Sequence, residues 1–208
     1  MGGLFYNEVV LGGVGRTGWW LVDDDREAGP ARTVAGPFPD RADANWAAGV
    51  QECGDPDGVR PVFGTGRADG GLGCRPSPQD RAWLAHLEAQ LDRLPHGWDA
   101  DLSDDDDLVT LVVEVTAALA EAGLPLSDGN GAGTETGGAS LTPEPALGGI
   151  LVTWRQHDRM SVEQIHGAAA DVLVHDLMSR ALADVLRLRG FAVDTFGSGN
   201  GHLVRLPA

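Results

Sequence analysis

The chain has 208 residues, 42% of them hydrophobic, and a formal net charge of −16, so it is long and apolar enough for one domain or two small ones. Such an acidic surface disfavours direct binding to nucleic acid or to anionic membranes, and no stretch approaches the roughly 20 apolar residues that span a bilayer. The first residues lack the features of a signal peptide, so we expect a cytoplasmic protein.

Residues 1–63 predict a small β-rich unit with the element order β-β-β-α-β. A cluster of glycines after Leu11 supplies the turn between the first two strands, and Pro37 ends the third strand. Asp40 is placed to cap the helix that follows. The expected elements are strands near 4–11, 18–23 and 32–36, a helix over 41–48 and a strand over 59–63.

Within this unit, the stretch from Val34 to Ala44 (VAGPFPDRADA) resembles the strand, Gly-Pro-Phe and alanine-rich helix of many small bacterial modules, including SPOR-like repeats that bind peptidoglycan. The likeness covers this short stretch alone. We transfer no function and no binding residue from it, because a role in the cell wall disagrees with the cytoplasmic expectation.

The segment 64–77 is rich in glycine and proline and predicts a linker to a second unit over 78–208. That unit predicts the order α-α-β-β-α-β-β, with helices on one face of an antiparallel sheet, so the whole chain is expected to be α+β. Ser77 and Ser103 are each placed to cap a helix. The expected elements are helices over 78–94 and 104–122, strands near 139–142 and 147–155, a long helix over about 162–189, and strands over 191–196 and 202–206.

The long helix is amphipathic and ends at Gly190. Its apolar residues recur at helical spacing, so they predict one continuous buried side. These residues are Ile165, Ala169, Val172, Leu173, Leu177, Leu182, Val185 and Leu186.

The sharpest cluster of chemically active side chains is Arg155, His157, Asp158 and Arg159, where a predicted strand gives way to a helix. His157 with Asp158 could act as a general base with an orienting carboxylate, and the two arginines could bind phosphate or carboxylate. The alternative is a polar loop with surface ion pairs. The pattern favours this alternative, because adjacent residues rarely face the same site.

Candidate interaction residues are three tryptophans and an acidic run. Neighbouring residues of a strand point to opposite faces, so one of the first two tryptophans is covered by the second unit or presented to a partner. The acidic run either mimics the phosphates of DNA or caps a helix, and the helix dipole favours the cap. The residues are Trp19, Trp20, Trp154, Asp104, Asp105, Asp106 and Asp107.

No pattern predicts a metal or a cofactor. Glu163 and His166 have the helical spacing of a metal-binding pair, but a di-iron site needs a second such helix, so we expect solvent-facing histidines. Cys53 and Cys74 belong to no C-x-x-C pair and are expected to be free thiols. All 15 basic residues are arginine, a bias typical of a GC-rich bacterial genome of the actinobacterial kind.

These observations favour a non-catalytic, acidic binding or adaptor protein that acts through a protein partner or through self-association. The hypothesis follows mainly from the absence of a motif for any mechanism. Two alternatives stay open. One is an enzyme that uses the cluster around His157 on an anionic small substrate, and the other is an acidic DNA mimic that inhibits a nucleic-acid-binding protein.

Overall fold

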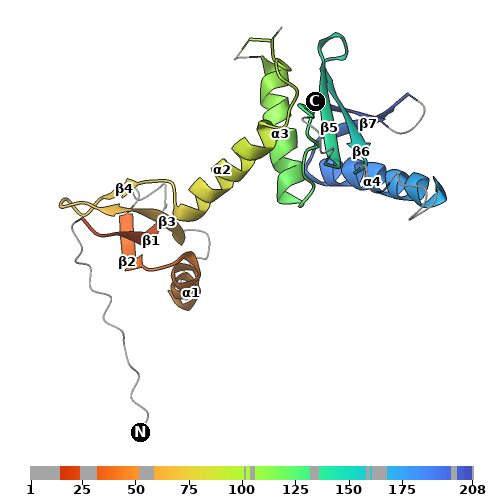
Figure 1. Cartoon of the computed structure of the whole chain (residues 1–208). Helices are drawn as coiled ribbons and strands as arrows, with labels where there is room; N and C mark the ends of the chain where they lie inside the picture. Colours follow the sequence, from red (N-terminus) through yellow and green to blue (C-terminus); the bar gives the residue numbers. More distant parts are fainter. Residues whose placement is uncertain are drawn as a thin grey trace. The chain divides into compact units, whose positions relative to one another are not determined.

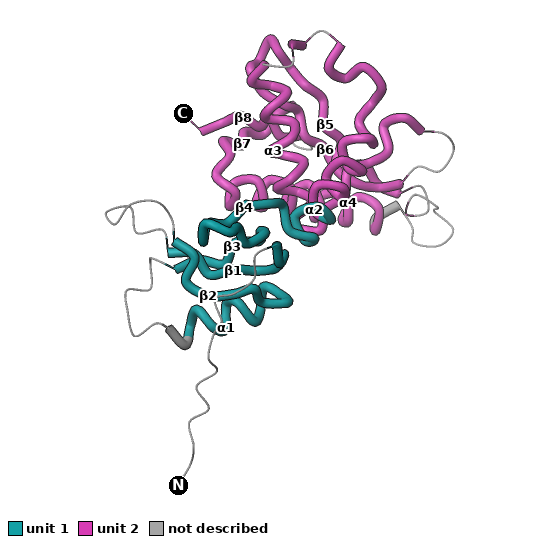
Figure 2. The backbone as a smooth tube through the Cα atoms, turned by 90° about the vertical axis from the view of Figure 1, so that its left-hand side faces the viewer, with its two compact units in different colours: residues 1–82 teal, residues 83–208 magenta. Residues whose placement is uncertain are grey.

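In a computed structural model, the chain forms two compact units, within 1–82 and 83–208 (Figure 1, Figure 2). Each unit contains a four-stranded antiparallel sheet and helices, so the predicted α+β class is confirmed. The structure describes residues 15–23, 32–51, 59–100, 102–103, 106–131, 136–157, 160, 168–197 and 201–207.

The first unit is a sheet of four strands in the order β2-β1-β3-β4, with one helix packed on it. The long strand β1 lies inside the sheet and pairs antiparallel with both β2 and β3. The strand predicted near 4–11 lies outside the described residues. The elements of this unit are β1 (Thr17–Asp23), β2 (Arg32–Phe38), α1 (Arg41–Gln51), β3 (Val59–Gly66) and β4 (Leu72–Cys74).

The segment predicted as a linker, 64–77, is instead largely a hairpin of the first sheet. β3 continues to Gly66 and pairs with β4, which forms one edge of the sheet. Glycine allows this pairing, because a Cβ on Gly64 would lie 2.7 Å from the carbonyl oxygen of Gly73. Gly70, in the turn between the strands, has a φ of +79°, which other residues rarely adopt. Gly64 and Gly70 therefore allow β3 and β4 to pack closely and to be joined by a tight turn.

The core of the first unit lies between its sheet and α1. Asp40 caps α1 as predicted, since its carboxylate accepts a hydrogen bond from the backbone N–H of Asp43 at 2.8 Å. The fully buried residues come from β1, β2 and α1, so these three elements are held together by one apolar cluster. Its buried members are Trp19, Leu21, Ala35 and Ala44.

The second unit has a sheet in the order β5-β6-β8-β7, and its elements follow one another as predicted from the sequence. The boundary between the two units falls between Ala82 and Trp83, within α2. The elements are α2 (Pro78–Leu91), α3 (Asp107–Glu121), β5 (Gly138–Glu144), a short 3₁₀ turn (Pro145–Leu147), β6 (Gly149–Arg155), α4 (Ala168–Leu188), β7 (Ala192–Phe196) and β8 (Gly201–Arg205).

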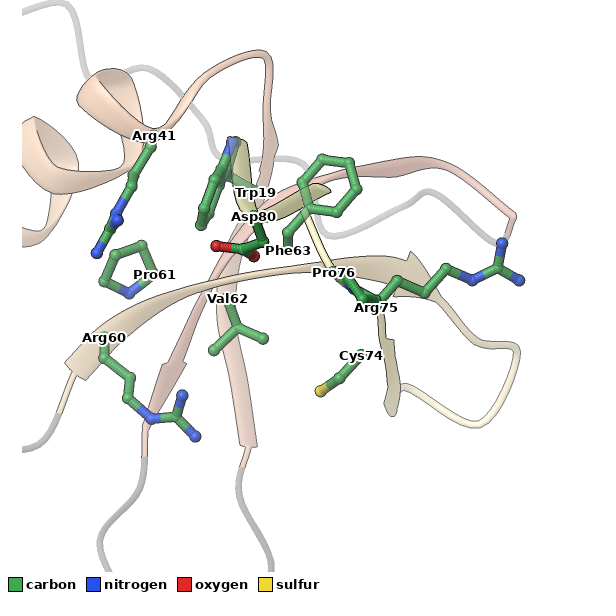
Figure 3. A pocket seen from close by; sticks show the side chains of 10 residues that line it. All are labelled: Trp19, Arg41, Arg60, Pro61, Val62, Phe63, Cys74, Arg75, Pro76 and Asp80. Atoms are coloured by element: carbon green, nitrogen blue, oxygen red, sulfur yellow. The ribbon is translucent and has the colours of Figure 1, made fainter. Parts of the chain in front are cut away.

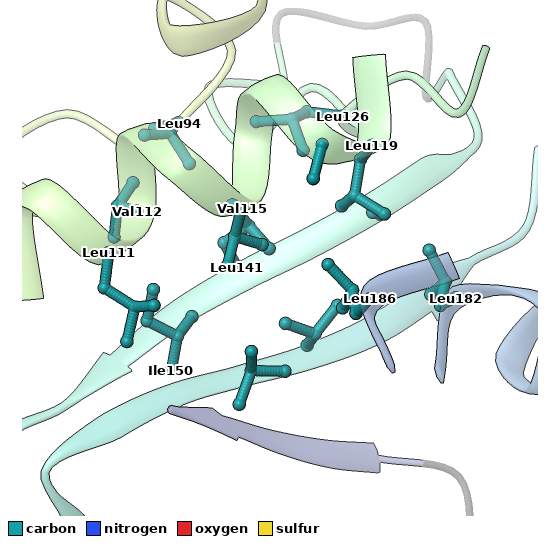
Figure 4. Packing of buried hydrophobic residues seen from close by; sticks show 14 of the residues in the cluster. Leu94, Leu111, Val112, Val115, Leu119, Leu126, Leu141, Ile150, Leu182 and Leu186 are labelled. Carbon is teal, nitrogen blue, oxygen red and sulfur yellow. The ribbon is translucent and has the colours of Figure 1, made fainter. Parts of the chain in front are cut away.

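The core of the second unit joins α3 and α4 to β5, β6 and β8 (Figure 4). On α3, Leu111, Val115 and Leu119 recur at helical spacing and are almost fully buried. α4 contributes Leu182 and Leu186, one turn apart. Each such side chain contributes roughly 1.5–3 kcal/mol on burial, so this cluster is the main source of stability in the unit.

The start of α3 differs from the prediction. Ser103 does not cap the helix, which begins at Asp107. Asp106 is the cap, and its carboxylate accepts a hydrogen bond from the backbone N–H of Leu108 at 2.9 Å. A carboxylate at this position satisfies an unpaired N–H and also favours the positive end of the helix dipole.

The predicted buried side of the long helix is wrong over the first half of α4. Val172, Leu173 and Leu177 are 59%, 68% and 58% exposed, although their spacing matches that of the buried residues. The buried residues of the described helix begin at Ser179. None of the described helices is both long enough and apolar enough to cross a membrane.

His202 on β8 is a buried histidine, 6% exposed. Its Nε2 lies 2.9 Å from the carbonyl oxygen of Ser179 on α4, so the imidazole N–H donates to that carbonyl. Its Nδ1 has no hydrogen-bond partner among the described residues. Burial lowers the pKa of His202 below its ordinary value of 6.5; the bond to Ser179 and the charge of Asp184 oppose this, and Arg187 adds to it. The folded protein therefore holds this imidazole neutral at pH 7.

We expect the free energy of unfolding to lose a contribution from His202 as the pH falls below about 6.5. The unfolded chain then binds a proton that the folded protein resists, until the pH reaches the lowered pKa. The loss is at most about 1.4 kcal/mol per pH unit. Urea denaturation at pH 7.5 and 5.5 measures it. Between pH 7.5 and 5.5, His202→Gln should lose less of its free energy of unfolding than the wild type does. The control His157→Gln, at an exposed histidine, should lose as much as the wild type. Equal losses in all three proteins would contradict this account.

Candidate functional site: an arginine-lined pocket in the first unit

A pocket of about 410 Å³ opens beside the first sheet, and every residue that lines it belongs to the first unit (Figure 3). Three arginines and one aspartate give the lining an excess of positive charge, although the whole chain carries −16. The lining residues are Trp19, Arg41, Arg60, Pro61, Val62, Phe63, Cys74, Arg75, Pro76 and Asp80.

The pocket lies where β4 leaves the edge of β3. The two strands pair over Gly64–Gly66 of β3, and the next contact is a hydrogen bond of 3.0 Å that the backbone N–H of Arg75 donates to the carbonyl of Phe63. Pro76 follows and cannot donate a further ladder hydrogen bond. Beyond Phe63, no described strand pairs with this edge of β3.

Pro61 lies on this open edge of β3. In an antiparallel strand every second residue faces the same neighbour, so Pro61 faces the same side as Phe63. Proline is tolerated in β3 because its missing N–H points away from β1. At Pro61 the open edge therefore offers a carbonyl acceptor and no donor.

Trp19 and Phe63 form an aromatic wall of the pocket. Their ring centroids are 5.5 Å apart at an angle of 68°, an edge-to-face arrangement. The guanidinium carbon of Arg41 lies 5.6 Å from the centroid of the Trp19 ring, within the range of a cation–π contact. Arg41 is the first residue of α1, where the helix dipole disfavours a cation, so the Trp19 ring offsets an unfavourable position.

Asp80, in the first turn of α2, supplies the one carboxylate of the lining. It forms a reciprocal cap with Ser77, as the sequence predicts: the N–H of Ser77 donates to Oδ2 at 2.8 Å, and the N–H of Asp80 donates to the Ser77 hydroxyl at 3.0 Å. Hydrogen bonds to the carboxyl of Asp80 from the backbone N–H and from the side chain of Ser77 hold its pKa below the ordinary value of 3.8; burial opposes this, and the charge of Arg41 adds to it. Asp80 is therefore a fixed negative charge at neutral pH.

The three guanidinium groups lie on different sides of the pocket. Figure 3 shows Arg41 beside Pro61, Arg60 on the other side of β3, and Arg75 extending past the ring of Phe63. The free thiol of Cys74 is exposed and also lines the pocket. The three arginines come from α1, from β3 and from the end of β4, and Figure 3 does not show their guanidinium groups meeting at one point.

The candidate cluster around His157, for which the sequence favours a polar loop, is only partly described, and the described part does not line this pocket. Arg155 ends β6 and His157 follows in a loop; both are exposed, and they belong to the second unit. The carbonyl of His157 accepts a hydrogen bond from the N–H of Met160 at 2.8 Å. Asp158 and Arg159 lie outside the described residues.

The three candidate tryptophans do not form an exposed patch in the described structure. Trp19 and Trp20 are 5% and 4% exposed. The indole N–H of Trp20 donates to the carbonyl of Gly64 at 3.2 Å, so this side chain is satisfied inside its own unit. Trp154 is half-buried and packs against the core of the second unit. A partner would therefore meet none of the three as a protruding ring.

The acidic run is described in part. Asp106 caps α3 and Asp107 is its first residue, whereas Asp104 and Asp105 lie outside the described residues. The described half of the run thus starts a helix, which is the alternative that the sequence favours. Among the described residues, no three histidine, cysteine or acidic side chains lie together as they would to hold a metal ion.

Comparisons of the chain with protein-family models, with curated proteins and with solved structures found no match. The SPOR-like resemblance is thus without support from a family model.

The arginines of the pocket are missed by sequence reasoning, because Arg41, Arg60 and Arg75 are far apart in the chain and line one pocket only through the fold. One signal was available: Pro61, inside a predicted strand, indicates a sheet edge.

The cap between Ser77 and Asp80 can be tested by titration. We expect Ser77→Ala to raise the pKa of Asp80 toward 3.8, because the variant removes the side-chain hydrogen bond from Ser77 to the carboxyl and leaves the backbone N–H of Ser77 in place. Ser77→Thr should keep the pKa low, and Arg41→Gln should raise it less than Ser77→Ala does. Carboxyl-carbon NMR titration measures these changes. An unchanged pKa in Ser77→Ala would show that the hydroxyl does not bond as described.

Proposed function

We propose that the protein is a non-catalytic binding protein whose first unit holds an anionic ligand in the arginine-lined pocket. The observation that carries the proposal is the gathering of Arg41, Arg60 and Arg75 around one cavity, against the single carboxylate of Asp80. Arginine binds carboxylate and phosphate groups through a planar fork of donors, so this lining suits an anion.

The charge of the whole chain makes this gathering more informative. At a net charge of −16, most of the surface repels an anion. A pocket in such a protein attracts an anion only where cations outnumber acids at short range, where attraction exceeds the screened field of distant carboxylates. The lining of this pocket contains three arginines and one carboxylate.

The same lining supports binding rather than catalysis. It contains no histidine, and Asp80 is engaged with Ser77 and has a lowered pKa, so it is a poor proton acceptor at neutral pH. The enzyme alternative would rely on His157 and Arg155, which lie on another unit and line no part of this pocket.

Titration with sodium phosphate, with ionic strength held constant by sodium chloride, tests the proposal. The side-chain Nε–H NMR signals of Arg41, Arg60 and Arg75 should shift and saturate together. Arg41→Gln should weaken binding about tenfold, since a hydrogen bond to a charged group is worth roughly 1.5–3 kcal/mol.

The matched control is Arg67→Gln, which removes the same charge from the β3–β4 turn. Arg67 is exposed, pairs with Asp69 at 3.0 Å and does not line the pocket, so this variant should bind phosphate as the wild type does. Equal weakening by Arg67→Gln would mean that phosphate responds to net charge alone, and the proposal would fail.

The exposed side of α4 supports a second candidate function, self-association. Val172, Leu173 and Leu177 leave three large apolar side chains in contact with water. The exposed charges on the same helix balance, since Asp176 and Asp184 oppose Arg180 and Arg187. Two copies could thus bring this side together without the repulsion that the charge of −16 imposes elsewhere.

We expect Leu173→Ser/Leu177→Ser to weaken dimerisation about tenfold or more, because each leucine buries apolar area at the contact. Sedimentation velocity over a range of protein concentrations measures the dimer constant. Leu84→Ser is the control, since Leu84 is also exposed but lies on α2. A wild-type protein that stays monomeric at its highest soluble concentration would rule out this candidate.

A further inference from the structure

The lining of the pocket is apolar in half of its residues, which a site for a bare inorganic anion does not need. Trp19, Phe63, Val62, Pro61 and Pro76 contribute this half. The volume of about 410 Å³ also falls within the range of pockets that enclose small organic molecules, roughly 300–1,000 Å³. Pocket size and lining therefore favour a ligand with an apolar body as well as a charge.

We infer that the ligand is a small organic carboxylate, with one anionic head on an apolar body. This inference rests on the proposed function. A carboxylate matches the planar fork of a guanidinium group with two parallel hydrogen bonds. Asp80 stays ionised inside the lining and repels a ligand of charge −2 more than one of charge −1. The head contacts Arg41, and the body lies against the half-buried ring of Phe63.

The open edge of β3 argues against a peptide that adds as a further strand. Strand addition relies on main-chain hydrogen bonds along the edge. Pro61 has no N–H to donate, and the carbonyl of Phe63 already accepts from the N–H of Arg75. A peptide would therefore lose two of the main-chain hydrogen bonds of this edge, whereas a small carboxylate needs none from the edge.

A homologous series of sodium carboxylates tests the inference on the full chain. Acetate, butanoate and hexanoate are titrated at constant ionic strength, with phosphate and an acidic hexapeptide for comparison, and the Arg41 Nε–H signal is followed. Each added methylene should tighten binding by up to about fourfold, because a buried methylene is worth about 0.8 kcal/mol. Hexanoate should bind more tightly than phosphate and than the peptide.

Two variants separate the head from the body of the ligand. Phe63→Leu removes apolar surface from the side of β3 that the body contacts, so it should weaken hexanoate two- to fourfold, on the order of one lost methylene, and leave acetate unchanged. Phe38→Leu, at a half-buried phenylalanine of β2 outside the pocket, is the matched control and should change neither. Arg41→Gln should weaken every carboxylate alike.

The outcomes distinguish this inference from the proposed function. Saturable binding that does not strengthen with chain length, or tighter binding of phosphate or of the peptide, overturns the carboxylate while the anion pocket stands. If the Arg41 Nε–H signal does not shift with any anion in the series, both the carboxylate inference and the proposed anion pocket are overturned. A chain-length effect that Phe63→Leu reduces and Phe38→Leu leaves intact supports the inference.

Discussion

The antiparallel pairing of β1 with β3 is the interaction on which the pocket depends. Seven consecutive residue pairs hold the strands in one register, and this register sets Trp19 opposite Phe63. Trp19 thereby packs in the core beneath α1 and makes the cation–π contact with Arg41. Phe63 lies at the edge of β3 that β4 does not cover. A slip of one residue would turn Trp19 to the opposite face of the sheet, so the core and the pocket wall would be lost together.

Asp80 connects the charge of the pocket to the start of α2. Its hydrogen bonds with Ser77 are local and hold the carboxylate in place, whether or not a ligand balances Arg41. The pocket therefore keeps one fixed negative group among three cations, which limits how much negative charge it accepts. A site whose groups are held before binding loses little conformational entropy on binding, so even a small ligand can gain measurable affinity there.

Local signals allowed most of the second unit to be predicted from the sequence. Strand pairs joined by short turns and helices with capping residues follow from nearby residues alone, and the elements appear in the expected order, although the cap of α3 is Asp106 and not Ser103. The prediction of a linker over 64–77 is wrong for a related reason. Glycine content indicates that the backbone has few steric restrictions, but not whether the segment forms a linker or a strand. At Gly64 the missing Cβ lets β4 approach closely, and composition does not show which strand will lie beside this glycine.

The features that bear on function depend on contacts that no local pattern contains. Arg41, Arg60 and Arg75 share a pocket because a helix, a strand and a strand end meet at one sheet edge. The periodicity of α4 marks its apolar side correctly but says nothing of how far the sheet extends beneath it. From Ser179 onward that side is buried, and before it the same spacing leaves Leu173 and Leu177 in water. The exposed half of α4 thus results from a helix longer than the part that its own sheet buries, and apolar area of this kind is stabilised only when another surface covers it.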